Sequence, residues 1–170
     1  RCVVFQEDAL FPWLNVQENI AFGLKIKRRY KKYVRDRVDH FMSLVGLSEF
    51  KNCLPGEISG GMKQRVALAR VLILEPRVLL MDEPFAALDA QTREEMQRLL
   101  LTLWEQLSHT IIFVTHDVNE AILLADRILI MDKSPGRIRE VMHVDLHRPR
   151  KRDRNDFLLF SRKVYEVLSD

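Results

Sequence analysis

The stretch "RVLLMDEP" (residues 77–84) decides the fold, because a short apolar run ends there in two adjacent carboxylates, Asp82 and Glu83. A continuous apolar run of this length favours a strand that is buried on both faces of a parallel sheet. Ligands of open α/β sheets bind at the carboxyl ends of the strands. Asp82 is therefore a candidate for holding Mg²⁺, and Glu83 for orienting or deprotonating a water. The alternative is that the two acidic residues only cap the loop that follows.

The segments around this strand alternate between strand and helix patterns. We expect strands over 2–5, 110–117 ("TIIFVTHD", buried) and 127–132 ("RILIMD"), with helices over 89–107 and 117–126. Within the longer helix, Thr92 and Glu95 have the spacing of a capping box. The β-α-β-α-β order from residue 77 predicts an α/β fold with a mostly parallel sheet and flanking crossover helices.

The segment between residues 15 and 57 is mainly helical in its pattern and interrupts the sheet as an insertion. Asn15 is suited to cap its first helix. Gly46 follows the apolar stripe of the next helix and is suited to end it.

A serine and two glycines open the following stretch, "ISGGMKQRVALAR" (58–70). Ser59 is predicted to cap a helix that Gly60 and Gly61 begin. Such a turn is suited to an anion, because free backbone N–H groups and the helix dipole point the same way. No GxxxxGK[ST] phosphate-binding loop accompanies it in this sequence.

Further polar residues follow the predicted strands. His116 is expected at the same sheet edge as Asp82 and Glu83, although a single histidine is most often structural. Asp117 is a candidate helix cap, with Glu120 three residues later. Asp89 is either a helix cap or part of the site, and Gln6, which ends the first strand, is uninformative alone.

The formal net charge is +3, but basic residues gather in two runs, residues 25–37 and 148–154. Such runs are most often solvated faces, and contact with anionic lipid or an acidic partner is the sharper alternative. Neither run has a nucleic-acid reader motif, which disfavours nucleic acid as a partner.

The order of the motifs is more specific than any one of them. Gln6, "ISGGMKQR", "RVLLMDEP", "AALD" and "TH" follow one another at compatible spacing over essentially all 170 residues. In this order the chain resembles an ATP-binding cassette (ABC) ATPase. Finer stretches, such as "DALFPWLNVQENIAFGLK", resemble the ATPases of nitrate, sulfonate and taurine importers. The resemblance implies a partial P-loop NTPase fold with an inserted helical subdomain.

The resemblance also implies a role for each motif residue in ATP hydrolysis with Mg²⁺. By this resemblance Gln6 is the Q-loop glutamine that contacts Mg²⁺ or water, and the signature motif consists of Ser59, Gly60 and Gly61. Asp82 is the Walker B aspartate, and Glu83 is the catalytic glutamate. Asp89 is the D-loop residue, and His116 is the switch histidine. Met62 departs from the usual glutamine of the signature. The Walker A P-loop is also missing, and in the family it precedes Gln6. The chain is therefore expected to be truncated at its N-terminus and inactive alone.

The resemblance further implies a domain plan, partners and a location. The expected segments are 1–7 (end of a core strand and Q-loop), 8–75 (helical subdomain with the signature), 76–145 (RecA-like core) and 146–170 (basic segment and helix). The expected partners are a second ATPase subunit in a nucleotide-sandwich homodimer, permease subunits and, indirectly, a periplasmic solute-binding protein. The expected location is the cytoplasmic face of the bacterial inner membrane, with the aromatics of "LFPW" (10–13) near the permease. A small local core around Phe11 and Trp13 is the alternative for those aromatics.

Two functions other than transport are the alternatives. Non-transport ABC-type ATPases carry a long coiled coil between the Q-loop and the signature, and residues 7–58 are too few for one. A non-catalytic interaction module is the second alternative, because the P-loop is missing.

Overall fold

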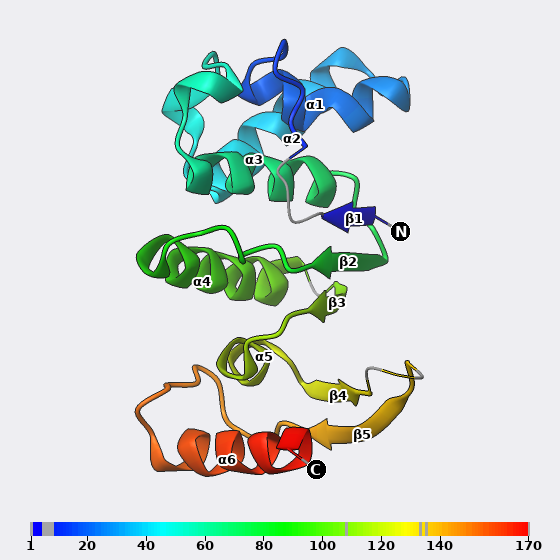
Figure 1. Cartoon of the computed structure of the whole chain (residues 1–170). Helices are drawn as coiled ribbons and strands as arrows, with labels where there is room; N and C mark the ends of the chain where they lie inside the picture. Colours follow the sequence, from blue (N-terminus) through cyan, green and yellow to red (C-terminus); the bar gives the residue numbers. More distant parts are fainter. Residues whose placement is uncertain (1, 5–8, 108, 133, 135, 170) are drawn as a thin grey trace. The chain divides into compact units, whose positions relative to one another are not determined.

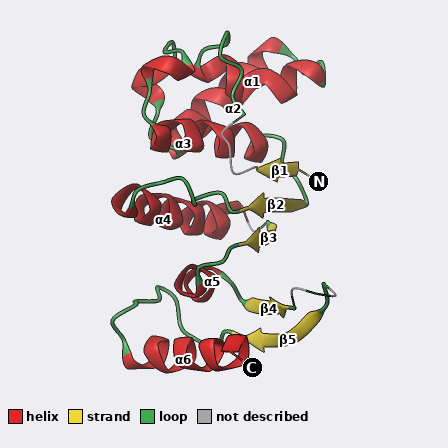
Figure 2. Cartoon of the chain, viewed as in Figure 1, coloured by secondary structure: helices red, strands yellow, loops and turns green. Residues whose placement is uncertain are grey.

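The computed structural model describes the whole chain except residues 1, 5–8, 108, 133, 135 and 170 (Figures 1 and 2). The chain forms two compact units, Arg1–Val114 (unit 1) and Thr115–Asp170 (unit 2). Unit 1 contains β1 (Cys2–Val4), α1 (Val16–Ile26), α2 (Lys31–Leu44), the 3₁₀ turns η1 (Ser48–Phe50) and η2 (Pro55–Glu57), α3 (Gly60–Leu72), β2 (Val78–Asp82), α4 (Ala90–Leu107) and β3 (Thr110–Val114). Unit 2 contains α5 (Val118–Leu124), β4 (Arg127–Met131), β5 (Ile138–His143) and α6 (Asn155–Ser169). No helix in the described part of the chain is both long and apolar enough to cross a membrane.

The sheet of unit 1 is parallel, with the strand order β1-β2-β3. Met81 in the middle strand lies opposite Val4 on one side and Phe113 on the other. The α4 crossover connects β2 to β3, which confirms the predicted β-α-β unit. The carboxyl ends of β2 and β3 therefore lie side by side, with Asp82 opposite Val114.

Only one face of this sheet is buried. Leu79 is fully buried, whereas Ile112 and Val114 on the opposite face are 52% and 51% exposed. The prediction of a buried strand over 110–117 ("TIIFVTHD") is therefore wrong: the strand ends at Val114, and alternate residues of it are exposed. The cause is that alternate residues of a strand point to opposite faces, and one of the two faces is open to solvent.

Local capping explains where the inserted helices begin and end. The Asn15 side chain accepts from the Glu18 N–H at 2.9 Å, and Glu18 Oε2 accepts from the Asn15 N–H at 3.2 Å, so α1 starts with a complete capping box. After α2, Gly46 has a φ of 69°, and the Leu47 N–H donates to the Met42 carbonyl at 2.8 Å. Both predicted helix boundaries are confirmed.

The helix α4 begins at Ala90, as the predicted range 89–107 and the candidate cap Asp89 indicate. Asp89 Oδ1 accepts from the Thr92 N–H at 3.0 Å, so the helix starts directly after Asp89 and Thr92 lies in its first turn. The predicted capping box of Thr92 and Glu95 is therefore wrong. Glu95 Oε2 instead pairs with Arg65 Nη2 at 3.1 Å and links α4 to α3.

Unit 2 has its own sheet and core. The strands β4 and β5 pair antiparallel, so the third strand of the predicted β-α-β-α-β order lies in a second, antiparallel sheet. The short connection between Met131 and Ile138 leaves no room for the crossover that a parallel pair would need. A core led by Ile122, Phe157 and Val164 joins this sheet to α5 and α6.

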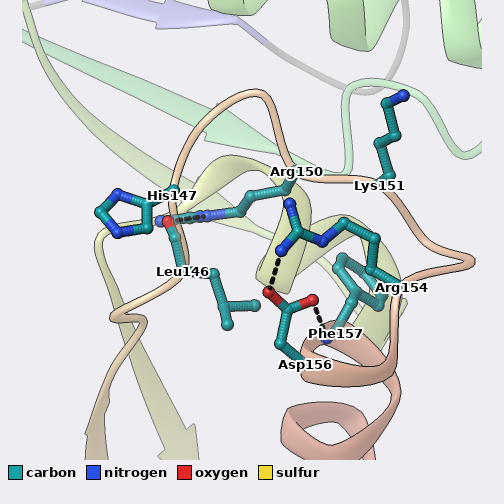
Figure 3. Close-up of a pocket in the computed structure, with 7 residues that line it drawn as sticks. All are labelled: Leu146, His147, Arg150, Lys151, Arg154, Asp156 and Phe157. Atoms are coloured by element: carbon teal, nitrogen blue, oxygen red, sulfur yellow. Dashed lines mark hydrogen bonds and ion pairs between the residues drawn. The ribbon is translucent and has the colours of Figure 1, made fainter.

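Arg150, in the segment that follows β5, links this segment to the end of α5. It is 9% exposed, and its guanidinium donates to the carbonyls of Ile122 (2.7 Å) and Ala125 (2.6 Å) at the end of α5. Figure 3 shows a pocket that Arg150 helps to line; the Arg150 side chain donates to the Leu146 carbonyl at 3.0 Å, and Arg154 pairs with Asp156. These basic side chains are thus held by contacts within the chain.

Candidate active site

The acidic pair, Asp82 and Glu83, lies at the carboxyl end of β2. Asp82 is exposed, Glu83 is half-buried, and the Glu83 N–H donates to the Val114 carbonyl at 3.0 Å. Glu83 has a φ of 42°, in the left-handed region that few residues other than glycine adopt. Strained backbone of this kind persists only where surrounding contacts fix it, and it is frequent at functional sites.

Two side chains fix the loop that follows the acidic pair. Gln64 of α3 is 2% exposed, and its Nε2 donates to the Pro84 carbonyl at 2.7 Å. Arg93 of α4 donates from Nε to the Phe85 carbonyl (3.3 Å) and from Nη2 to the Leu88 carbonyl (2.8 Å). Both helices therefore hold the chain between the acidic pair and Asp89.

Sequence reasoning missed both of these residues. Arg93 had a signal, because a cation in the first turn of a helix is unfavourable with the dipole and therefore suggests another partner. The hydrophobic periodicity gave no signal for Gln64, because this residue lies off the apolar stripe that predicted α3.

The signature turn, residues 58–61, begins α3 as predicted. Ser59 Oγ accepts from the Met62 N–H at 3.3 Å, and helical geometry leaves the N–H groups of Gly60 and Gly61 without an intrahelical acceptor. Gly60 is exposed with open space around its Cα. The turn is therefore accessible to an anion.

Gly61 has a packing role that the sequence did not reveal. A Cβ atom at this position would clash with Thr92 Cγ2, so the glycine allows the N-terminal ends of α3 and α4 to approach closely. The same Thr92 hydrogen-bonds Asp89. The structure thus brings the signature turn and Asp89 together through one threonine.

Asp89 is an ionised helix cap. Hydrogen bonds from the Thr92 side chain and then from the Thr92 N–H hold the pKa of Asp89 below its ordinary value. The helix-cap alternative for Asp89 is therefore confirmed, and its exposed carboxylate leaves a further role in the site open.

His116 lies two residues after β3 and belongs to unit 2, where it is exposed. Its neighbour Asp117 caps α5, with Oδ1 accepting from the Asn119 N–H at 2.8 Å. Glu120 accepts from the Thr115 hydroxyl at 2.6 Å. The shared edge expected for His116 and the acidic pair stays a prediction, and Gln6 lies outside the described residues.

The donor set fits Mg²⁺ bound together with a substrate. Among the described residues, no three His, Cys, Asp or Glu side chains form a protein-only metal cluster. Mg²⁺ at phosphate-transfer sites usually takes one or two carboxylates and completes its shell with water and phosphate oxygens. An exposed Asp82 at a strand end, followed by Glu83, offers such carboxylates.

Comparison with known proteins decides the family. The family model described as ABC transporter matches residues 2–86. The chain belongs to the ABC transporter ATP-binding family.

Two curated ABC relatives and one ABC structure illustrate the similarity. An uncharacterized ABC transporter ATP-binding protein of Methanocaldococcus jannaschii is 46% identical over the whole chain. The aliphatic sulfonates import ATP-binding protein SsuB of Bacillus cereus is 50% identical over 96% of the chain. The structure of cbiO1 from Clostridium perfringens, part of the ABC transporter complex cbiONQ, matches 97% of the chain with a TM-score of 0.77 and 31% identity. The chain spans 64% of the length of those two curated relatives and 61% of cbiO1. The predicted ABC ATPase fold, an α/β fold with parallel strands and flanking helices, is confirmed.

A loop that precedes α1 presents the aromatic residues of this ABC domain. Asn19 is fully buried; its Nδ2 donates to the carbonyls of Phe11 (3.1 Å) and Leu14 (2.8 Å), and its Oδ1 accepts from the Phe11 N–H at 2.9 Å. The Phe11 ring contacts Phe22 and Trp13, with centroids 4.3 Å and 5.7 Å apart, and Trp13 is still 73% exposed. The two aromatics therefore contact each other as the local-core alternative expects, and most of the Trp13 surface is available for another contact. Asn19 lies on the apolar stripe of α1, which was the signal that could have revealed it.

Proposed function

We propose that the chain carries the hydrolytic half-sites of the ATP-hydrolysing subunit of a solute importer. The observation that carries this proposal is the acidic pair at the carboxyl end of β2, with Glu83 in a strained backbone conformation. The loop that follows is fixed from α3 by Gln64 and from α4 by Arg93. Positioning of this kind is the main contribution of a protein to phosphoryl transfer.

Each motif residue has a part in the proposed reaction, in-line attack of water on the γ-phosphate of ATP. Glu83 orients the water or accepts its proton, which is worth roughly 10²–10⁴-fold in rate. Asp82 holds Mg²⁺, and Gln6 reaches the same ion or its water. Mg²⁺, when bound, neutralises charge on the phosphate oxygens. His116 contacts the γ-phosphate.

The signature turn serves ATP that is bound mainly by a second subunit. Ser59 and Gly60 are exposed, and the helix dipole of α3 favours an anion there. In this proposal two copies of the subunit pack head to tail, and Ser59 with the amides of Gly60 and Gly61 holds the γ-phosphate. Asp89, joined to this turn through Thr92, lies near the boundary between the copies.

The exposed Trp13 and the loop fixed by Asn19 form the proposed contact with permease subunits, at the cytoplasmic face of the inner membrane. A periplasmic solute-binding protein acts only indirectly. In this proposal the segments 1–7, 8–75, 76–145 and 146–170 keep the roles expected from the sequence. The solute is a small sulfonate, or a related nitrate- or taurine-type compound, supported by the 50% identity to a sulfonate import protein.

The test is the Glu83→Gln variant in the subunit assembled with its permease in vesicles. ATP binding is expected to persist, while ATP hydrolysis and uptake of a labelled aliphatic sulfonate fall by roughly 10²-fold or more. Glu105→Gln removes the same charge from an exposed position near the end of α4 and is the matched control.

Three results would contradict parts of the proposal. Hydrolysis by Glu83→Gln at the Glu105→Gln rate rejects the assignment of Glu83. Hydrolysis without sulfonate uptake in the wild type rejects the solute class. Nucleotide binding without any hydrolysis in the wild type supports the non-catalytic module.

A further inference from the structure

A basic turn connects α1 to α2, and we propose that it docks the protein on membranes rich in anionic lipid headgroups. The basic turn is residues 25–33, and every one of its side chains is exposed. None of them is acidic; the cations are Lys25, Lys27, Arg28, Arg29, Lys31 and Lys32, and the other three are Ile26, Tyr30 and Tyr33. The proposal concerns a surface that the hydrolytic residues do not use.

The backbone folds back tightly within the basic turn. The Arg29 N–H donates to the Leu24 carbonyl at 3.3 Å, and the Arg28 N–H donates to the Lys25 carbonyl at 3.0 Å. Arg28 occupies the left-handed position of this turn with a φ of 51°, where glycine is the usual residue. An arginine in this backbone conformation is less favourable than a glycine would be. The neighbouring side chains of the turn are exposed to solvent.

Helix stability explains only part of this charge. Lys25, in the last turn of α1, interacts favourably with the negative end of the helix dipole. Lys31 and Lys32 lie in the first turn of α2, at the positive end, and that turn has no acidic residue. Two lysines at this end destabilise the helix, so their presence points to a role outside folding.

The positive charge is also left uncompensated. None of the six cations has an ion pair in the part of the chain that the structure describes. Asp36 on α2 and Glu75 after α3 pair with two other arginines, Arg35 and Arg37. The Arg29 guanidinium lies over the ring of Tyr33, a residue of the same turn, 6.0 Å from its centroid.

The apolar members of the turn favour a membrane over an acidic protein or a nucleic acid. Tyr30 is 89% exposed and Ile26 is 65% exposed, although both have apolar surface to bury. Tyrosine is enriched at headgroup level in membrane interfaces, and clustered basic residues are attracted to anionic leaflets. The strength of binding at a membrane surface increases with buried apolar area and with attraction to anionic lipids, and this turn supplies side chains for both.

This inference rests on the proposed function only in that an importer subunit works at a membrane. The test is co-sedimentation of the full chain with vesicles of phosphatidylcholine alone or mixed equally with phosphatidylglycerol. We expect binding to the anionic vesicles, weakened by salt. Each basic side chain near an anionic surface contributes roughly a factor of five, so Lys31→Glu with Lys32→Glu should weaken binding at least about tenfold. Tyr30→Ser should weaken it less.

The matched control is Arg162→Glu with Lys163→Glu, an adjacent exposed pair on α6 with the same change of charge. Equal loss in both double variants, or no binding to anionic vesicles by the wild type, overturns the proposal. Binding to polyglutamate or to RNA in place of vesicles also overturns it and identifies the other class of partner. Vesicle binding does not depend on Glu83, so failure of the hydrolysis assignment leaves this result unchanged and the two tests are independent.

Discussion

The two basic runs of the chain look alike in sequence and differ in structure. The first run contains the basic turn (residues 25–33). Every side chain of this turn is exposed, and its cations have no ion pairs among the described residues. In the second, residues 148–154, Arg150 is buried and Arg148 is bonded to both Asp126 and the Leu124 carbonyl at 2.6 Å. The basic turn is a surface feature, whereas Arg148 and Arg150 of the second run belong to the edge and core of unit 2.

The two runs differ in burial because hydrogen-bond acceptors lie near the arginines of the second run. The helix α5 ends at Leu124, and the last carbonyls of a helix have no partner within it. Arg150 reaches these carbonyls and those of the segment after β5, including Val144 at 3.0 Å. Burial, and then the charge of Arg148, lowers the pKa of Arg150, while Asp126 opposes this shift; a guanidinium nevertheless stays protonated. Charge density alone therefore does not identify a docking surface.

Removing the buried guanidinium should have the largest effect. Arg150→Met leaves several buried carbonyls without donors, and each such group costs about 1–3 kcal/mol. We expect unit 2 to lose about 3 kcal/mol or more of unfolding free energy in urea, followed by circular dichroism. Lys151→Met is the control, because this neighbouring exposed residue should change stability by less than about 0.5 kcal/mol. Equal unfolding midpoints for the two variants would show that Arg150 is not a structural residue.

Replacing Arg148 should cause a smaller loss of unfolding free energy than replacing Arg150. Its pair with Asp126 is partly solvated and contributes little, but its bond to the Leu124 carbonyl closes the same helix end. Arg148→Gln should therefore reduce the unfolding free energy of unit 2 by about 1 kcal/mol, measured in the same urea titration. A loss as large as that of Arg150→Met would mean that the two arginines act as one unit, which a double variant would test.

The sequence predicted those parts of the molecule that depend on local chemistry. Asn15, Gly46, Ser59 and Asp117 begin or end helices as expected, because capping involves residues only a few positions apart. The acidic pair lies at the carboxyl end of β2 as expected, because an apolar run with a polar end is typical of a parallel strand.

What the sequence could not predict depends on contacts between distant residues. The Gln64 bond to the Pro84 carbonyl and the approach of Thr92 to Gly61 leave no periodic signal. The apolar pattern of β3 did not show that Ile112 would face solvent, because an apolar run predicts strand type but not what covers each face. The expectation of a solvated face does not hold for Arg150 in the second basic run, for the same reason: its acceptors at the end of α5, the carbonyls of Ile122 and Ala125, lie more than twenty residues away in the chain.

The smallest change in stability is expected in the basic turn, and it should be a gain in stability where the two arginine variants lose it. Replacing Lys31 and Lys32 by glutamate puts acidic residues in the first turn of α2, where the helix dipole favours them. The double variant should therefore be more stable than the wild type, by about 0.5–1 kcal/mol at low ionic strength, with a higher thermal midpoint. This gain should shrink in salt, because the interaction is exposed to solvent. A clear loss of stability would mean that the lysines support the fold as Arg150 does, and the contrast between the two runs would fail.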